Sequence, residues 1–165
     1  GAHWAGGELG HTVICMDGEP CNCGRRGCWE AYSAAPALIR QTQRAMQAHP
    51  ESKLWQAAPQ LSQVSGKTVF QAVAMGDEAA RAVLDFYVKA LAVGLSNVVN
   101  SLDPDVLCLG GGVSGAGEAL MRPLRAEMAG QSYARPGQET TKLVLAQLGN
   151  DAGLVGAAML YRQHR

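Results

Sequence analysis

Residues 8–30 read ELGHTVICMDGEPCNCGRRGCWE, and they hold four of the chain's five cysteines, three of them within eight positions. Cys21, Cys23 and Cys28 are spaced C-x-C-x4-C, and His11 lies ten positions before the first of them. Three thiolates and one imidazole complete the tetrahedral shell of a structural zinc ion. The pattern therefore predicts a Zn²⁺ site of His11, Cys21, Cys23 and Cys28, with no coordination position left open for Lewis-acid catalysis.

The residues between the cysteines fit this interpretation. Gly24 and Gly27 allow a tight loop in which three sulfur atoms converge, and Arg25 and Arg26 can offset the excess negative charge. The alternative is that the cysteines are free or disulfide-bonded and that the histidine is unrelated to them. Because the cysteine count is odd and no secretory signal is present, a reducing compartment and a metal are favoured. We therefore expect a cytoplasmic protein.

Two carboxylates flank the predicted metal ligands. Glu8 precedes His11 by three positions, and Glu30 follows Cys28 by two. Short tethers to one metal should bring both carboxylates to one region, where the zinc-bound imidazole has a second N–H to direct. Two acceptors and one donor suit the hydroxyl groups of a sugar. Two alternatives stay open: that Glu30 only complements a helix dipole, and that Glu8 is a solvated loop residue.

The pattern of apolar residues predicts an α/β chain. We expect strands over 11–16, 105–109 and 142–148, and helices over 29–49, 68–75, 116–128 and 152–162, with loops or short helical pieces over 51–66. A long buried helix should begin after Asp77 as N-cap and end before Pro104. The alternation of helix and strand in the second half is typical of parallel pairing in a covered sheet. Cys15 and Cys108 lie in strand-like apolar runs and are expected to be buried.

Composition excludes some classes of function. The chain has 165 residues, 47% of them apolar, and 14 basic residues balance 14 acidic ones. No nucleic-acid partner is expected through this segment, because a basic surface is missing. No membrane partner is expected, because no apolar run approaches the length of a membrane span. The chain opens in a glycine-rich loop with no strand before it, so we expect the C-terminal portion of a longer polypeptide.

A second glycine-rich motif, LGGGVSGAG at 109–117, joins a predicted strand to a predicted helix. Gly110, Gly112 and Gly115 match G-x-G-x-x-G, but NAD binding also requires an acidic residue at the end of the next strand, which is lacking. A general nucleotide or phosphate loop over Gly110, Gly111 and Gly112 is therefore preferred. Close packing of strand against helix is the other interpretation left open.

Together these motifs resemble the ROK family of repressors and kinases. The matching segments are E-x-G-H at 8–11, C-x-C-G-x-x-G-C-x-E at 21–30, NSLDPDVLCLGGGVS at 100–114 and LGNDAGLVGAA at 148–158. The resemblance implies an actin-like, ribonuclease-H-like α/β fold of two lobes, with residues 1–165 as the C-terminal lobe and the N-terminal lobe outside this chain. It divides the chain into a zinc loop (11–30), a helical insert (31–102) and a nucleotide-side α/β part (103–165).

The resemblance also implies a function. Residues matching Glu8, His11 and Glu30 bind sugar hydroxyls in the family's kinases, and the glycines matching Gly110, Gly111 and Gly112 line the ATP site. The implied reaction is phosphorylation of a hexose 6-hydroxyl, with ATP and Mg²⁺, by a homodimer or homotetramer; glucose is the expected substrate. The family's D-x-G-G-T loop and catalytic aspartate lie upstream, so no catalytic residue is assigned here and the chain alone is expected to be inactive. The alternative is the sugar-sensing module of a ROK-family transcriptional repressor.

Overall fold

The structure is a computed structural model that describes residues 2–131, 133 and 140–160. Its helices are α1 (Glu30–Ser33), α2 (Ala35–Ala48), α3 (Leu54–Ala57), α4 (Thr68–Ala74), α5 (Glu78–Leu102), α6 (Glu118–Ala129) and α7 (Ala152–Leu160). Short 3-10 turns lie at Leu9–His11, Leu61–Gln63, Gly112–Ala116 and Gly149–Asp151. Strands β1 (Val106–Leu109) and β2 (Lys142–Leu145) pair in parallel, as expected, with Val106 opposite Lys142.

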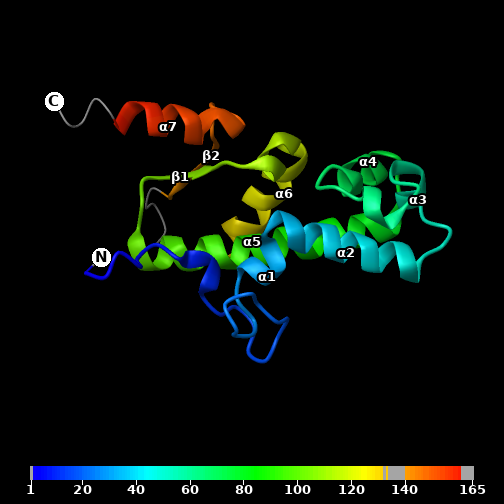
Figure 1. Ribbon diagram of the computed structural model, residues 1–165, viewed down its shortest axis with the longest axis horizontal. Helices are drawn as coiled ribbons and strands as arrows, with labels where there is room; N and C mark the ends of the chain where they lie inside the picture. The colour runs from blue at the N-terminus through cyan, green and yellow to red at the C-terminus, as the bar shows by residue number, and fades with distance from the viewer. Residues whose placement is uncertain (1, 132, 134–139, 161–165) are drawn as a thin grey trace.

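Helix α5 is the centre of the fold and packs against α1, α2, α4 and α6 (Figure 1). It begins at the predicted cap, where the Asp77 carboxylate accepts a hydrogen bond of 2.7 Å from the Ala80 N–H. The apolar residues that predict this helix recur every three or four positions; they are half-buried at Val83 and Leu91 and buried at Leu84, Tyr87, Val88, Leu95 and Val98. The expectation was wrong for Leu102, which is exposed in the last turn.

The length of α5 also corrects the expectation that no apolar run is long enough to span a bilayer. Its 25 residues pass that test by length and composition. More than half of its most apolar 18-residue window is buried within the protein, however. The physical reason for its apolar character is therefore its position in the core, where four other helices cover it.

Two predicted elements near the start of the chain differ in the structure. The helix expected over 29–49 is divided at Ala34, which is extended (φ −77°, ψ 160°). Pro36 has no N–H to donate to the Tyr32 carbonyl, and the side chain of Gln41 donates to that carbonyl at 2.9 Å in its place. The strand expected over 11–16 is reduced to an isolated bridge between Val13 and Cys28, because no second strand among the described residues lies beside it.

The two-stranded sheet is more exposed than the covered parallel sheet that the sequence predicts. Leu107, Leu109 and Leu143 pack on the core, whereas Val106 and Val144 face outward. Cys108 on β1 is exposed, as is Cys15, so the expectation of two buried thiols was wrong. Both strands read as apolar runs, but the described residues cover only one face of the pair. Helix α7 ends at Leu160 among the described residues, and residues 161–162 of the expected helix lie outside them.

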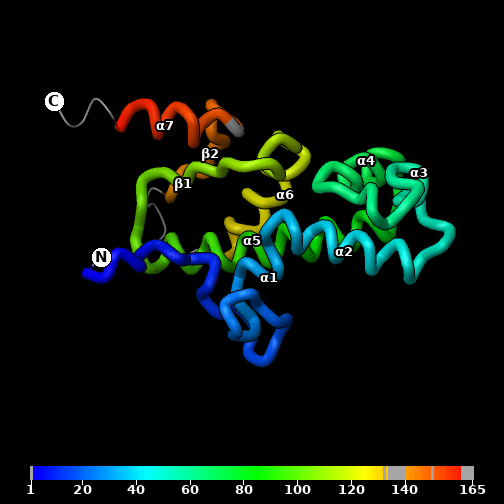
Figure 2. Tube along the Cα trace, viewed as in Figure 1, coloured from blue at the N-terminus to red at the C-terminus, as the bar shows by residue number. Residues whose placement is uncertain are grey.

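The segment that carries the cysteines stands apart from the sheet. We call residues 11–30 the cysteine loop. It projects to one side of α5, while β1, β2 and α7 lie on the other side (Figure 2). Helix α1 follows the loop directly and lies against α5. Any site on the cysteine loop is therefore connected to the rest of the fold mainly through α1 and α2.

Candidate metal centre and sugar site

The four predicted metal ligands converge. The candidate donor atoms of His11, Cys21, Cys23 and Cys28 all lie within 4.8 Å of one another. Cys23 Sγ is 3.6 Å from Cys28 Sγ, and His11 Nδ1 is 3.5 Å from Cys21 Sγ. A tetrahedral zinc ion with bonds of about 2.3 Å to sulfur and about 2.0 Å to nitrogen separates its ligands by roughly 3.8 and 3.5 Å. The four residues therefore fit the ion.

The disulfide alternative is not supported, because all five cysteines are free in the structure. A disulfide requires an S–S distance of about 2.05 Å. Burial, together with the neighbouring thiols of Cys23 and Cys21, raises the pKa of Cys28 to about 11. A hydrogen bond from the Arg25 backbone lowers the pKa of Cys23. Since metal-bound thiols are deprotonated, a metal ion entering this site displaces at least the Cys28 proton at neutral pH.

Backbone hydrogen bonds close the cysteine loop on itself. The N–H groups of Ile14 and Cys15 both donate to the Gly27 carbonyl, at 2.9 and 3.3 Å, and the Gly27 N–H donates to the Glu19 carbonyl at 2.8 Å. Gly27 has φ of +76°, and a Cβ built there would lie 1.6 Å from the Cys15 carbonyl oxygen. The predicted need for glycine is thus confirmed at 27, where left-handed backbone and close approach coincide.

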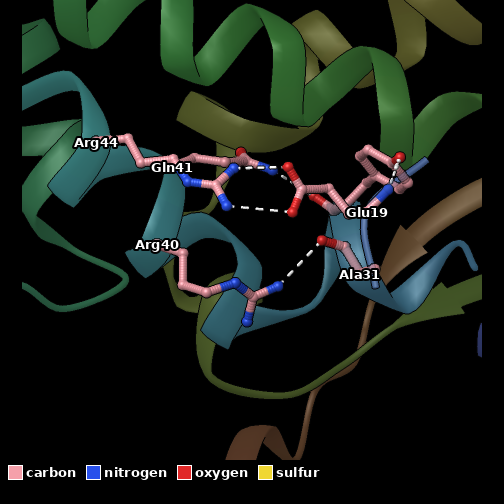
Figure 3. Close-up of polar contacts among 6 residues, drawn as sticks. Glu19, Ala31, Arg40, Gln41 and Arg44 are labelled. Carbon is pink, nitrogen blue, oxygen red and sulfur yellow. Dashed lines mark hydrogen bonds and ion pairs between the residues drawn. The ribbon is translucent and has the colours of Figure 1, made fainter. Parts of the chain in front are cut away.

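A polar cluster joins the cysteine loop to α2 (Figure 3). Arg44 donates to both carboxylate oxygens of Glu19, at 2.7 and 3.1 Å, and this ion pair holds the pKa of Glu19 below its usual range. The Glu19 N–H donates to the Tyr32 hydroxyl at 2.6 Å. Arg40 donates to the Ala31 carbonyl at 3.2 Å. The segment before Cys21 is therefore fixed to both helices that follow the loop.

The predicted sugar ligands lie on the edge of the metal cluster. His11 turns Nδ1 toward Cys21 and Nε2 toward Glu8, whose carboxylate oxygen is 4.0 Å away. Glu30 lies against the turn that carries these residues, since a Cβ on Gly10 would be 3.5 Å from its carboxylate oxygen. Both carboxylates are exposed. The structure thus brings Glu8, His11 and Glu30 together as one donor and two acceptors open to a ligand.

A cavity of about 560 Å³ lies beside this group, between the cysteine loop and the start of α2. Glu30 lines it, together with Asn22 and Arg40, but Glu8 and His11 do not. Neither Asn22 nor Arg40 is a candidate from the sequence alone, because Asn22 occupies an unspecified position of the cysteine motif and Arg40 lies outside every motif. Asn22 reaches the cavity wall from the cysteine loop and Arg40 reaches it from α2.

The glycine triplet lines a separate cavity of about 260 Å³. Gly110, Gly111 and Gly112 form one wall, and Ser33 and Tyr87 belong to the other. The connection from β1 passes through the 3-10 turn Gly112–Ala116, so α6 begins at Glu118, two residues later than expected. Strand β2 ends at Leu145 and is followed by Ala146 and Gln147, so the acidic residue of an NAD site is missing there.

Comparisons with known proteins agree with this geometry. A protein-family model described as "ROK family" matches residues 1–164. A glucokinase of Halalkalibacterium halodurans is 35% identical over 165 residues, which is 99% of this chain and 49% of that protein. A xylose repressor of Bacillus subtilis is 26% identical over 158 residues, covering 96% of this chain and 37% of the repressor.

A solved structure provides a similar match. The crystal structure of a ROK family glucokinase from Streptomyces griseus, in complex with glucose and AMPPNP, superimposes with a TM-score of 0.86 at 33% identity. The match covers 96% of this chain and 52% of that one. The expected α/β class and the actin-like sugar-kinase fold are thereby confirmed. The chain spans about half the length of the glucokinases it matches, and its place as the C-terminal lobe with three subdivisions stays a prediction.

Proposed function

Because this chain belongs to the ROK family, we propose that it supplies the zinc-binding and sugar-binding part of an ATP-dependent hexose kinase, with glucose as substrate. The observation that carries the proposal is the position of His11, between the cysteine ligands on one side and Glu8 on the other, 4.0 Å away. The similar glucokinases of known sequence and structure support the same assignment. The family's phosphate loop and catalytic aspartate would come from a part of the protein outside this chain.

The residues of this chain have distinct parts in the proposed reaction. His11, Cys21, Cys23 and Cys28 would hold Zn²⁺, which when bound keeps the imidazole neutral and fixed in orientation. The Nε2–H of His11 then donates to a sugar hydroxyl, and the carboxylates of Glu8 and Glu30 accept from others. Such a set fixes one sugar orientation, because a sugar with a different hydroxyl pattern leaves a donor or acceptor unpaired.

We assign Gly110, Gly111 and Gly112 to the nucleotide side. These glycines leave backbone N–H groups uncovered by side chains, and they line a cavity that also reaches Ser33 and Tyr87. ATP would bring Mg²⁺ with it, since the metal bridges the phosphate oxygens in phosphoryl transfer. We place the intact enzyme in the cytoplasm as a homodimer or homotetramer, as the resemblance implies.

The test is a coupled assay of ADP release by the full-length protein with ATP, Mg²⁺ and a panel of hexoses. We expect turnover with glucose at about 1–100 per second, the usual range of kinases. Glu8→Gln should raise the glucose KM roughly tenfold to a hundredfold, because it weakens a charge-assisted hydrogen bond. Glu51→Gln is the control: Glu51 is exposed beyond α2 and should not affect the KM. An unchanged glucose KM in Glu8→Gln would contradict the assignment of the pocket.

A sugar-responsive repressor is the second candidate, and the similarity to the xylose repressor favours it. The same assay separates the two candidates. Glucose binding without ADP release by the intact protein, together with a DNA-binding segment ahead of this chain, would favour the repressor.

A further inference from the structure

Helix α1 is a shared wall between the two candidate ligand sites. Its first residue, Glu30, lies against Gly10 in the proposed sugar site. Its last residue, Ser33, lines the cavity of the glycine triplet. The helix has only four residues and therefore gains little stability from its own hydrogen bonds. Its position must be set by contacts with other elements.

The first of these contacts is made by Trp29, immediately before α1. A Cβ built on Gly94 of α5 would lie 1.9 Å from Trp29 Cε2, so the indole occupies the space of the missing side chain. The backbone N–H of Trp29 also donates to the Thr12 carbonyl at 2.8 Å. Trp29 is the residue between Cys28 of the metal cluster and Glu30 of the proposed sugar site. Packing of the indole against α5 therefore fixes the backbone from which the Glu30 side chain extends.

The second contact is made by Tyr87 of α5, which is 2% exposed. Its hydroxyl donates to the Ser33 carbonyl at 2.8 Å, at the C-terminal end of α1. Tyr87 also lines the glycine-triplet cavity itself. This bond fixes the end of α1 that borders the proposed nucleotide site.

We propose that Trp29 and Tyr87 are positioning residues that anchor the two ends of α1 separately: Trp29 orients the sugar carboxylate Glu30, and Tyr87 orients the wall of the nucleotide cavity. This inference rests on the proposed kinase function. It predicts that the two residues affect the binding of different substrates. Loss of the Trp29 contact should affect sugar binding, and loss of the Tyr87 hydrogen bond should affect ATP binding.

The experiment compares variants of the full-length protein in the ADP-release assay, with the KM for glucose and for ATP measured separately. Trp29→Leu and Gly94→Ala should each raise the glucose KM roughly tenfold to a hundredfold, the usual cost of losing a residue that orients a ligand. Tyr87→Phe should raise the ATP KM roughly three- to tenfold, as expected for one hydrogen bond. In each case the KM for the other substrate should stay within about twofold of the wild type.

Two controls distinguish positioning from general stability. Trp55→Leu makes the same chemical change on α3, a helix that lies away from α1 (Figure 1); the Trp55 indole packs on the core and donates to the Met46 carbonyl at 3.0 Å. It should lower the melting temperature without changing either KM. In the double variant Trp29→Leu/Gly94→Ala, the methyl group of the new alanine occupies space that the Trp29 indole has left. Its glucose KM should therefore rise less than the product of the two single effects.

The proposal is overturned if Trp29→Leu and Gly94→Ala leave the glucose KM unchanged, or if they raise the glucose KM and the ATP KM equally. If the wild type shows no turnover with any hexose, the proposed function fails separately. The same variants are then compared by calorimetric titration with glucose and with ATP. Weaker glucose binding by Trp29→Leu than by the wild type, with an unchanged Kd for ATP, still supports the positioning role. A glucose Kd equal to that of the wild type overturns it.

Discussion

Two glycines of the cysteine loop should respond very differently to the same substitution. Gly24 and Gly27 both have left-handed backbone, with φ of +84° and +76°. A Cβ on Gly24 meets nothing within 4 Å, whereas a Cβ on Gly27 would lie 1.6 Å from the Cys15 carbonyl oxygen. Gly24→Ala therefore introduces only backbone strain. Gly27→Ala introduces the same strain and must also separate the two sides of the loop.

The difference can be worked out from the hydrogen bonds at Gly27. Left-handed backbone costs an alanine about 1–2 kcal/mol, and this cost applies to both variants. Relieving the overlap at Gly27 breaks the three hydrogen bonds that join it to Ile14, Cys15 and Glu19. At about 1 kcal/mol each, these add about 3 kcal/mol to the cost of Gly27→Ala alone. Because the metal cluster requires the closed loop, the added cost corresponds to a roughly hundredfold loss of zinc affinity.

The assay is competition for Zn²⁺ between the purified protein and a chromophoric chelator, with metal content determined by mass spectrometry after dialysis. We expect one zinc ion in the wild type and in Gly24→Ala, with affinities within about tenfold of each other. Gly27→Ala should bind roughly a hundredfold more weakly than Gly24→Ala. Equal zinc affinities for the two variants would refute the reasoning, because they would show that the close approach at Gly27 does not hold the ligands together.

Three further predictions concern the metal and two carboxylates. Removing the metal with EDTA should lower the melting temperature and speed amide hydrogen exchange in residues 11–30 but not in α5; an unchanged melting temperature would count against a structural zinc. Asp77→Ala should lower the free energy of unfolding by about 3 kcal/mol, because it removes the cap of α5 and the acceptor of the Lys53 N–H, as urea melts would show. Burial opposes ionisation of Asp77, but its hydrogen bonds outweigh burial and lower its pKa. The stability that the ionised Asp77 contributes should therefore be complete above about pH 4 and be lost as the pH falls further. Urea melts of Asp77→Ala should not show this pH-dependent loss of stability. Arg44→Ala should cost less than about 1 kcal/mol, since the ion pair is partly exposed, and should raise the pKa of Glu19 in an NMR titration; an unshifted carboxyl would exclude the ion pair.

The sequence by itself predicted the metal ligands. Their identity follows from the chemistry of thiolate and imidazole ligands and from spacing within one short loop, so no distant contact is needed. Most helices were predicted for the same reason, because the Asp77 cap and the apolar periodicity of α5 are local features. Local signals were insufficient at residues 11–16, where a strand requires a partner and the part of the chain that the structure describes supplies only an isolated bridge to Cys28.

Only the tertiary structure decided how the sites are held. The contact of Trp29 with Gly94 and the hydrogen bond from Tyr87 to Ser33 join segments more than 50 residues apart in the sequence. The place of Glu30 beside Gly10 depends on the same packing of α1 against α5. A glycine inside an apolar helix carries no sign of the side chain that will lie on it. Such contacts are set by the packing of one element on another, which the spacing of residues along a single chain does not encode.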